Sequence, residues 1–318
     1  MDHVALTYRS FGLPQASLKL EATPLEAPRG DMLRVAMRQV PINPSDLIPV
    51  TGAYAHRINL PAIAGYEGVG RVISAPSQKA DLIGCRVLPL RGAGTWQSYV
   101  DCDPELAIPV PEGINDDVAA RAYINPLAAS QMLERWLVYG KRVLLSGAGS
   151  TCADLLGHWA RLNGAAEVVG LYRSASRVER LRELGIVPAP AANEDEAKHR
   201  ARAADVTFDS LGGPLASLIL DNMRAGTSFI SYGLLTGQSI RPSKPPLAAF
   251  ERFHLRDSLA NMRPEEWQLV FRRIWPKLEA ITLPAVRFYA FSEWQAAIME
   301  TSRPGGAKPI LCFDAYSQ

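Results

Sequence analysis

A glycine-rich segment is the part of this sequence best suited to binding chemistry. Gly147 and Gly149 follow a short apolar run, and Ser150 and Thr151 come directly after them. Glycines at this spacing let a backbone turn tightly beside a pyrophosphate, and the hydroxyls and N–H groups at a helix N-terminus bind phosphate. Ala153 is the last small position, which the dinucleotide fingerprint permits for close helix–strand packing. A plain turn would also explain two glycines, but the position between strand and helix favours a dinucleotide site.

The end of the next apolar run indicates which dinucleotide is bound. NAD sites usually place an acidic residue about 20 residues after the glycines, where it binds the ribose 2′-hydroxyl. Here the run ends in Arg173 and Ser174, followed by Arg177, while Glu167 lies at the start of the run. Guanidinium groups beside a hydroxyl suit a 2′-phosphate, which predicts NADPH. The alternative is that both arginines are surface charges at the start of a helix.

The composition is that of an ordinary globular protein of about two domains, at roughly 150 residues per domain. The 318 residues hold 34 Lys+Arg and 32 Asp+Glu, a net charge of only +2, so nucleic-acid and membrane partners are not expected. Residues 1–10 lack an apolar signal segment, and no run of about 20 apolar residues occurs. The cysteines show no paired spacing, which predicts reduced thiols and a cytoplasmic location; they are Cys85, Cys102, Cys152 and Cys312.

The first 115 residues are predicted to be rich in β-strands. One run places Leu33, Val35 and Met37 on one face of a strand. Arg34 and Arg38 alternate with them on the other face. Similar short runs separated by Pro, Gly and Asp predict a small antiparallel barrel or sandwich.

From about residue 117 the pattern becomes an alternation of strands and helices. It predicts the α/β class, with a doubly wound parallel sheet (Rossmann) in residues 117–255 and a second, β-rich domain in residues 1–116 and 256–318. In the tail, Ser292 is expected to cap a helix, and Pro309–Phe313 is expected to join the sheet of the first domain. The predicted strands are Arg142–Ser146, Glu167–Tyr172, Asp205–Asp209 and Thr227–Tyr232.

An ordered set of motifs carries a family resemblance over almost the whole chain. The set is Asn43-Pro-Ser-Asp46, Gly52-Ala-Tyr54, Gly65-Tyr-Glu67-Gly68, Gly94-Thr-Trp96, Asn125-Pro-Leu127, the Gly147 turn, Asp209-x-x-Gly212-Gly213, Tyr232-Gly233 and Gly306-x-Lys308-Pro-Ile-Leu311. The chain resembles the zinc-free branch of the medium-chain dehydrogenase/reductase superfamily, and within it the 2-enoyl thioester reductases and their quinone-oxidoreductase relatives. The resemblance implies that the β-rich part is a GroES-like catalytic domain beside the Rossmann domain.

The same resemblance bears on metal binding. Zinc-dependent relatives carry a Cys at or near the position of Asn43 and a His at that of Tyr66, before Glu67. Neither of these ligands is present, and the clustered cysteines of a structural zinc lobe are missing as well. No metal is therefore expected, which leaves hydride transfer from a nicotinamide to an activated double bond as the chemistry.

The resemblance also assigns roles to individual residues. Tyr54 would donate to the charge that develops on the substrate carbonyl or protonate the α-carbon, with His56 as an alternative acid. Asn43 would hydrogen-bond near the nicotinamide ribose. Further cofactor contacts are implied for Ser210, Tyr232, Gly233 and Phe253. The Gly147 turn, Asn43 and Tyr54 are expected to meet in a cleft between the two domains.

Some residues depart from the family pattern and keep other functions open. Ala128 stands where relatives usually have Thr, Ala153 where they have Gly, and His254 where the enoyl reductases tend to have Trp. Trp96, Phe253 and Trp267 would line an acyl pocket or belong to the core; the core is the commoner place for aromatic side chains. The leading hypothesis is an NADPH-dependent reductase of 2-enoyl thioesters. The alternatives are a quinone or 2-alkenal reductase, and an NADPH-binding protein without turnover.

A homodimer is also expected. The apolar run Thr227–Tyr232 and the following Gly233–Ile240 could present a sheet edge to a second copy, as the resembling family commonly does. Exposed sheet edges are normally covered.

Overall fold

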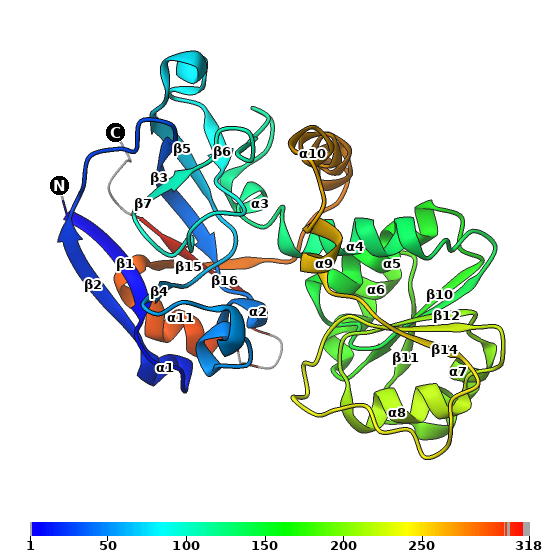
Figure 1. The fold of residues 1–318 in the computed structure, drawn as a ribbon. Helices are drawn as coiled ribbons and strands as arrows, with labels where there is room; N and C mark the ends of the chain where they lie inside the picture. The colour runs from blue at the N-terminus through cyan, green and yellow to red at the C-terminus, as the bar shows by residue number, and fades with distance from the viewer. Residues whose placement is uncertain (1, 302, 304–305, 314–318) are drawn as a thin grey trace. The chain divides into compact units, whose positions relative to one another are not determined.

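The computed structural model describes residues 2–301, 303 and 306–313. The chain forms two compact units: unit 1 is Met1–Ile124 with Arg263–Gln318, and unit 2 is Asn125–Met262. The first boundary falls after residue 124 instead of 116 and the second after residue 262 instead of 255, so both lie later in the chain than expected from the sequence. Figure 1 labels the helices and strands of both units. In the described ranges, no helix is both long enough and apolar enough to cross a membrane.

Unit 2 is built on a six-stranded, fully parallel sheet in the order β11-β10-β9-β12-β13-β14. This is the predicted doubly wound class. Its strands are β9 (Arg142–Leu145), β10 (Glu167–Tyr172), β11 (Val187–Pro190), β12 (Val206–Asp209), β13 (Ser228–Ser231) and β14 (Ala249–Arg252). Its helices are α4 (Ile124–Arg135), α5 (Thr151–Leu162), α6 (Val178–Glu183), α7 (Glu194–Ala203), α8 (Gly213–Asn222) and α9 (Leu255–Leu259). The first residue of α4 belongs to unit 1. The 3₁₀ turn η4 (Ala175–Arg177) comes directly before α6.

Burial explains why these short runs form central strands. Leu144, Val169 and Phe229 are buried in one cluster with the small residues Ala197 and Ala216 of α7 and α8. A parallel strand covered by helices on both faces is apolar along its length, unlike a strand with one wet face. The apolar runs in the sequence therefore identified the centre of this sheet.

The prediction that Thr227–Tyr232 presents a sheet edge is wrong. β13, which coincides with the run Thr227–Tyr232, pairs in parallel with β14, so it lies inside the sheet and β14 is the edge strand. The residues of β14 are mostly exposed and carry no period-two pattern, which is why the sequence did not indicate this strand. The segment Gly233–Ile240 does not continue the sheet, and Leu234 and Leu235 are about half exposed there.

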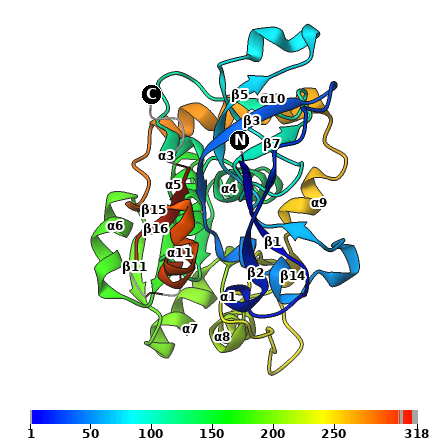
Figure 2. The same ribbon diagram turned by 90° about the vertical axis from the view of Figure 1, so that its left-hand side faces the viewer.

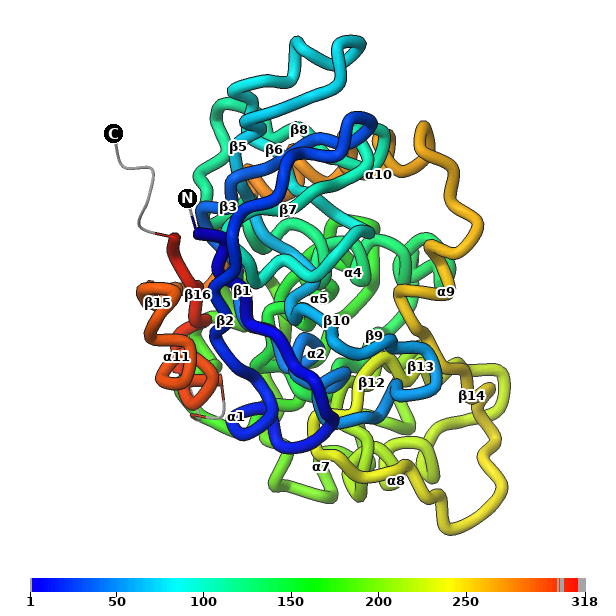
Figure 3. The backbone as a smooth tube through the Cα atoms, turned by 60° about the vertical axis from the view of Figure 1, so that its left-hand side comes forward, coloured from blue at the N-terminus to red at the C-terminus, as the bar shows by residue number. Residues whose placement is uncertain are grey.

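Unit 1 contains the β-rich part, in two sheets. The larger has the order β15-β16-β3-β5-β6-β8, with β7 paired to β3, and the smaller has the order β2-β1-β4. The strands are β1 (Asp2–Tyr8), β2 (Leu18–Pro24), β3 (Leu33–Pro41), β4 (Ala62–Ile63), β5 (Val69–Ser74), β6 (Arg86–Leu88), β7 (Tyr99–Cys102), β8 (Ile108–Pro109), β15 (Val286–Ala290) and β16 (Lys308–Cys312). Figure 3 traces the β1–β2 hairpin in blue beside β3.

Five helices and four 3₁₀ turns of unit 1 connect these strands within the described residues. They are α1 (Pro14–Ser17), α2 (Pro44–Leu47), α3 (Asp116–Ala119), α10 (Pro264–Glu279) and α11 (Trp294–Thr301), with 3₁₀ turns η1 (Pro49–Thr51), η2 (Ala55–Arg57), η3 (Ser77–Leu82) and η5 (Phe291–Glu293). The tail joins the larger sheet as expected, since β16 pairs antiparallel with β3. α11 lies against β16 (Figure 2).

The predicted alternation along β3 is confirmed, with one addition. Leu33, Val35 and Met37 belong to the hydrophobic core of unit 1. Arg34 is buried as well, because its Nε and Nη2 donate to the Asp101 carboxylate at 2.7 and 2.8 Å. A paired guanidinium can replace the water that it loses on burial.

Other local expectations have mixed outcomes. Ser292 does not cap a helix: it lies within η5, where the Glu293 carboxylate accepts the N–H of Ala290 instead. Trp96 and Trp267 are fully buried core residues, and their indole N–H groups donate to backbone oxygens at 3.2 and 2.8 Å. The core interpretation of these two rings is therefore the correct one.

Candidate functional site

The turn between β9 and α5 requires glycine at its first position. Gly147 has φ +62°, and a Cβ there would lie 2.4 Å from Ser210 Oγ and 3.0 Å from Leu211 Cδ2. Gly149 differs, because the nearest atom to a Cβ built there is Arg177 Cγ at 3.8 Å. Gly147 shapes the turn, whereas Gly149 leaves space beside the backbone that a ligand can approach.

The N-terminus of α5 follows this turn directly. Ser150 is its N-cap, and its Oγ accepts the N–H of Ala153 at 3.2 Å, with Thr151 as the first helical residue. A helix of 12 residues beginning here presents unpaired N–H groups and the positive end of its dipole. The turn and helix together are suited to an anionic ligand, and in this fold that ligand is a diphosphate.

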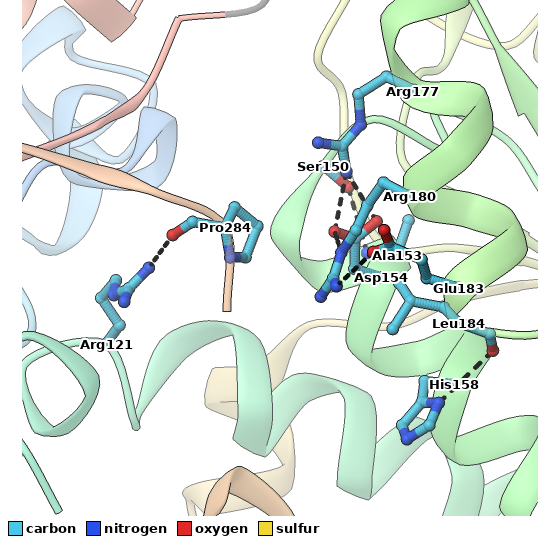
Figure 4. Close-up of polar contacts among 10 residues, drawn as sticks. All are labelled: Arg121, Ser150, Ala153, Asp154, His158, Arg177, Arg180, Glu183, Leu184 and Pro284. Carbon is cyan, nitrogen blue, oxygen red and sulfur yellow. Dashed lines mark hydrogen bonds and ion pairs between the residues drawn. The ribbon is translucent and has the colours of Figure 1, made fainter. Parts of the chain in front are cut away.

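The first turn of α5 also carries a buried acid that the sequence analysis missed. Asp154 is 1% exposed, and Arg177 Nη2 donates to both of its carboxylate oxygens at 2.8 Å (Figure 4). Arg180 Nε lies 3.6 Å from the same carboxylate. Burial raises the pKa of Asp154, and the attraction of the two guanidiniums opposes that rise. The pairing depends on the packing of η4 and α6 against α5, so no local pattern could have revealed it.

The residues predicted to select NADPH lie after β10. Arg173 and Ser174 are both exposed, and the Ser174 hydroxyl lies 2.8 Å from that of Ser176. Arg173 has no hydrogen bond or ion pair with any residue that the structure describes. Its guanidinium is therefore available to a ligand, whereas that of Arg177 is partly engaged by Asp154.

A buried polar cluster joins the carboxyl ends of β9 and β12. The Ser146 hydroxyl donates to Asp209 Oδ1 at 2.5 Å and accepts the N–H of Ser210 at 3.0 Å. The Ser210 hydroxyl donates to the Ser146 carbonyl at 3.2 Å. Asp209 also accepts the N–H groups of Leu211 and Gly212 at 3.2 and 3.0 Å, although burial raises the pKa of its carboxyl. These contacts hold Ser210 beside the Gly147 turn.

Tyr232 belongs to the same edge of the sheet. Its hydroxyl is buried near Cys152, Ser150 and Ser210. Burial raises the pKa of Tyr232 well above that of an ordinary phenol. The glycine turn, the N-terminus of α5 and these hydroxyls together fit a dinucleotide.

The remaining residues of unit 2 that the sequence analysis singled out lie in different surroundings. A Cβ on Gly233 would lie 2.6 Å from the Ser210 carbonyl oxygen, so this close approach requires glycine. The ring of Phe253 is buried edge-on against Trp136 at 6.1 Å between centroids, which places it in the core of unit 2. His254 is exposed and begins α9.

In unit 1, Asn43 belongs to a dense polar cluster. Its Nδ2 donates to Glu67 Oε1 at 2.7 Å, and its Oδ1 accepts from Lys308 Nζ at 2.5 Å. Glu67 Oε2 also accepts the N–H groups of Tyr123 and Ile124 at 3.2 and 2.8 Å. These partners determine the orientation of the Asn43 amide, since its oxygen faces a donor and its nitrogen an acceptor.

Charge is concentrated in the same cluster. Asp46 accepts the N–H groups of Asn43 and Tyr66 at 2.7 and 2.9 Å. Burial, with repulsion from Glu67, raises the pKa of Asp46 to about 7. Burial lowers the pKa of Lys308 to about 8, against the attraction of both acids. Across the described ranges, no group of three or more His, Cys, Asp and Glu residues is arranged to hold a metal ion.

Tyr54 lies on the turn that leads into η2. It follows Gly52, whose φ of +89° makes the chain reverse after η1. The Tyr54 ring is partly exposed. The Arg57 guanidinium stacks on this ring, with its Cζ 3.9 Å from the ring centroid. The hydroxyl makes no hydrogen bond with the described residues, and His56 beside it is exposed. The Tyr54 hydroxyl therefore has its donor uncommitted among the described residues.

The two glycines of the turn predict different mutant behaviour. Gly147→Ala should lower the melting temperature, because alanine must adopt a left-handed backbone with its Cβ against Ser210. Gly149→Ala should leave the melting temperature within about 2 °C and weaken dinucleotide binding, because its methyl occupies the open space beside the backbone. Circular dichroism melts and NADPH titrations measure both effects. Tight binding by Gly149→Ala would contradict the placement of a diphosphate at this turn.

Comparisons with known proteins agree with this architecture. The family model described as alcohol dehydrogenase GroES-like domain matches residues 29–112. The mitochondrial enoyl-(acyl-carrier-protein) reductase of Arabidopsis thaliana is 31% identical over 255 residues, which are 75% of this chain and 66% of that protein.

Solved structures extend the similarity to the whole chain. A candidate NADPH:quinone reductase from Bacillus thuringiensis is 31% identical with a TM-score of 0.91, covering 98% of this chain and 99% of that one. A mitochondrial 2-enoyl thioester reductase heterodimer from Candida tropicalis has the same fold, at 19% identity and a TM-score of 0.83, covering 98% of this chain and 100% of that one. The chain belongs to the medium-chain dehydrogenase/reductase superfamily, in its enoyl reductase and quinone oxidoreductase-like branch.

Proposed function

We propose that the protein is an NADPH-dependent reductase of activated carbon–carbon double bonds, with 2-enoyl thioesters as its substrates. The observation that carries this proposal is the Gly147 turn, whose backbone is suited to binding a diphosphate. Arg173, which follows the next strand β10, has a guanidinium without a partner among the described residues. Similarity to an enoyl-(acyl-carrier-protein) reductase over 75% of the chain supports the substrate class.

In this proposal unit 2 binds the cofactor. The N–H groups at the start of α5 hold the diphosphate, and Arg173, Ser174 and Arg177 hold the 2′-phosphate. Ser210, Tyr232 and Gly233 line the path from the turn, with the buried Tyr232 hydroxyl close to Ser210 and Ser150. NADPH bound there supplies a hydride to the β-carbon of the substrate.

Unit 1 supplies the groups that act on the substrate. The Tyr54 hydroxyl donates to the thioester carbonyl as negative charge grows on its oxygen, or protonates the α-carbon. Asn43 hydrogen-bonds near the nicotinamide ribose, in the orientation that Glu67 and Lys308 impose on its amide. A donor aimed at charge that appears only during the reaction stabilises the transition state more than the ground state.

Two other functions have specific support. A quinone or 2-alkenal reductase is favoured by the 31% identity to the candidate NADPH:quinone reductase over nearly the full length of both chains. An NADPH-binding protein without turnover is suggested by Ala128, which is buried on α4 and lacks a hydroxyl.

Replacing Tyr54 tests the proposed function. Rates of NADPH oxidation are measured with a crotonyl thioester, a 2-alkenal and a quinone, for the wild type and for Tyr54→Phe. With the thioester, the variant should lose about 10²–10⁴-fold in kcat, the usual contribution of general acid catalysis. With the quinone the loss should be smaller, because reduction of a quinone requires no protonation of carbon.

The NADPH affinity of Tyr54→Phe and the comparison of the three substrates serve as controls. NADPH affinity should be nearly unchanged in Tyr54→Phe, since the substitution removes only a hydroxyl of unit 1. Full thioester reduction by this variant would transfer the acid role to His56 or solvent. Oxidation of NADPH with the quinone or alkenal alone would favour the second function, and tight binding without oxidation would favour the third.

The cofactor assignment is tested at Arg173. Arg173→Ala should raise the KM for NADPH about ten- to a hundredfold and leave that for NADH nearly unchanged, because a charged hydrogen bond to phosphate contributes about 1.5–3 kcal/mol. Steady-state kinetics with both cofactors measure the ratio. An equal loss for both would show that Arg173 does not contact the 2′-phosphate.

We also propose that the protein is a homodimer that pairs through β14. This strand ends the described sheet, and Phe250 and the preceding Leu247 are partly exposed at 38% and 63%. An open strand edge favours pairing with a second copy. Sedimentation at micromolar concentration should give the mass of a dimer. A monomer under these conditions would contradict the pairing.

A further inference from the structure

The Asp154 carboxylate holds one arginine in a defined orientation. Both of its oxygens accept from the same amino group, Nη2 of Arg177, at 2.8 Å. Asp154 is almost fully buried, so it has lost its water and depends on this partner and on Arg180. A buried carboxylate restricts a guanidinium much more than a surface ion pair does.

The rest of the Arg177 guanidinium is left for another ligand. Arginine has five N–H donors, and Asp154 uses only those of Nη2. Nε is buried and has no hydrogen-bond partner within the described part of the chain. It lies 3.9 Å from the position that a Cβ of Gly149 would take, so the side chain borders the open space beside this glycine. An unpaired buried donor beside a ligand-binding turn indicates that the bound state supplies its acceptor.

The charges around the turn also fit an anion. Arg173, Arg177 and Arg180 bring three positive charges to the segment after β10, and Asp154 and Glu183 offset two of them. A phosphate monoester carries about −1.5 to −2 at neutral pH, so the remaining positive charge attracts it. Without its arginines, Asp154 would repel an anion at the N-terminus of α5.

We propose that Asp154 is a positioning residue for recognition of the 2′-phosphate: it fixes Arg177 so that Nε and Nη1 face the phosphate that distinguishes NADPH from NADH. The proposal rests on the proposed use of NADPH. Asp154 itself touches no ligand and acts only through Arg177. Its loss therefore affects the discrimination between phosphorylated and unphosphorylated ligands, rather than binding in general.

Two small ligands isolate this effect from catalysis. Adenosine 2′,5′-bisphosphate carries the 2′-phosphate, and AMP is the same molecule without it. Calorimetric titration of the full chain should show that Asp154→Asn weakens bisphosphate binding about tenfold, a tenfold change being about 1.4 kcal/mol. AMP binding should change less than about twofold, because Asn keeps the shape of the side chain and removes only its charge.

A matched variant controls for general effects of removing an acid from unit 2. Asp205 pairs with Arg224 at 2.9 Å just before β12, at the end of the parallel sheet opposite the turn. Asp205→Asn should leave the affinities for both ligands unchanged. Arg177→Gln provides an independent route should Asp154→Asn fold poorly, and it should weaken bisphosphate binding at least as much. In the Arg177→Gln background, Asp154→Asn should add less than about twofold, because its effect passes through the missing guanidinium.

The outcomes separate the inference from the function on which it rests. A wild type that binds the bisphosphate no better than AMP would overturn the use of NADPH, and this inference with it. A wild type that prefers the bisphosphate, with the preference retained in Asp154→Asn or Arg177→Gln, would overturn the role of Asp154 alone. Equal weakening of both ligands, or additive effects in the double variant, would show a merely structural residue.

Discussion

The candidate cofactor site depends on the missing Cβ at position 147. A left-handed glycine lets β9 turn into α5 within a few residues, and it leaves room for the Ser210 hydroxyl directly beside the turn. Ser210 in turn bonds Ser146 at the end of β9, so the two central strands finish together and their following loops share one edge. The helix N-terminus and the buried Tyr232 hydroxyl are placed by this arrangement.

A second constraint organises unit 1: a carboxylate removed from water must have its oxygens satisfied. Glu67 meets this need through Asn43 and the N–H groups that lead into α4, and Lys308 completes the cluster from a strand 265 residues further along the chain than Asn43. Burying acids and an amine together shifts their pKa values in opposite directions, upward for Glu67 and downward for Lys308. The result is an Asn43 amide whose orientation is fixed by its partners.

The sequence predicted those features that are local. The strand Glu167–Tyr172 and the glycine turn follow from residue type and spacing, and β3 follows from its alternation of apolar and charged residues. Pairing over long distances in the chain could not be read in this way. β14 covers β13 although its own residues are mostly exposed, and Asp154 meets Arg177 only after α5 and η4 pack together. Tyr54 was identified through family resemblance, and the structure adds that its hydroxyl is unpaired among the described residues.

The central claim is that hydride passes from NADPH to the β-carbon of a 2-enoyl thioester, and isotope transfer measures this most directly. The enzyme is incubated with crotonyl thioester and NADPH deuterated at C4, in separate reactions for the two C4 faces, and the butyryl product is analysed by mass spectrometry and NMR. The account predicts one deuterium at the β-carbon from one face of the cofactor and a solvent proton at the α-carbon. Deuterium at the α-carbon, or no label in the product from either face, would contradict it.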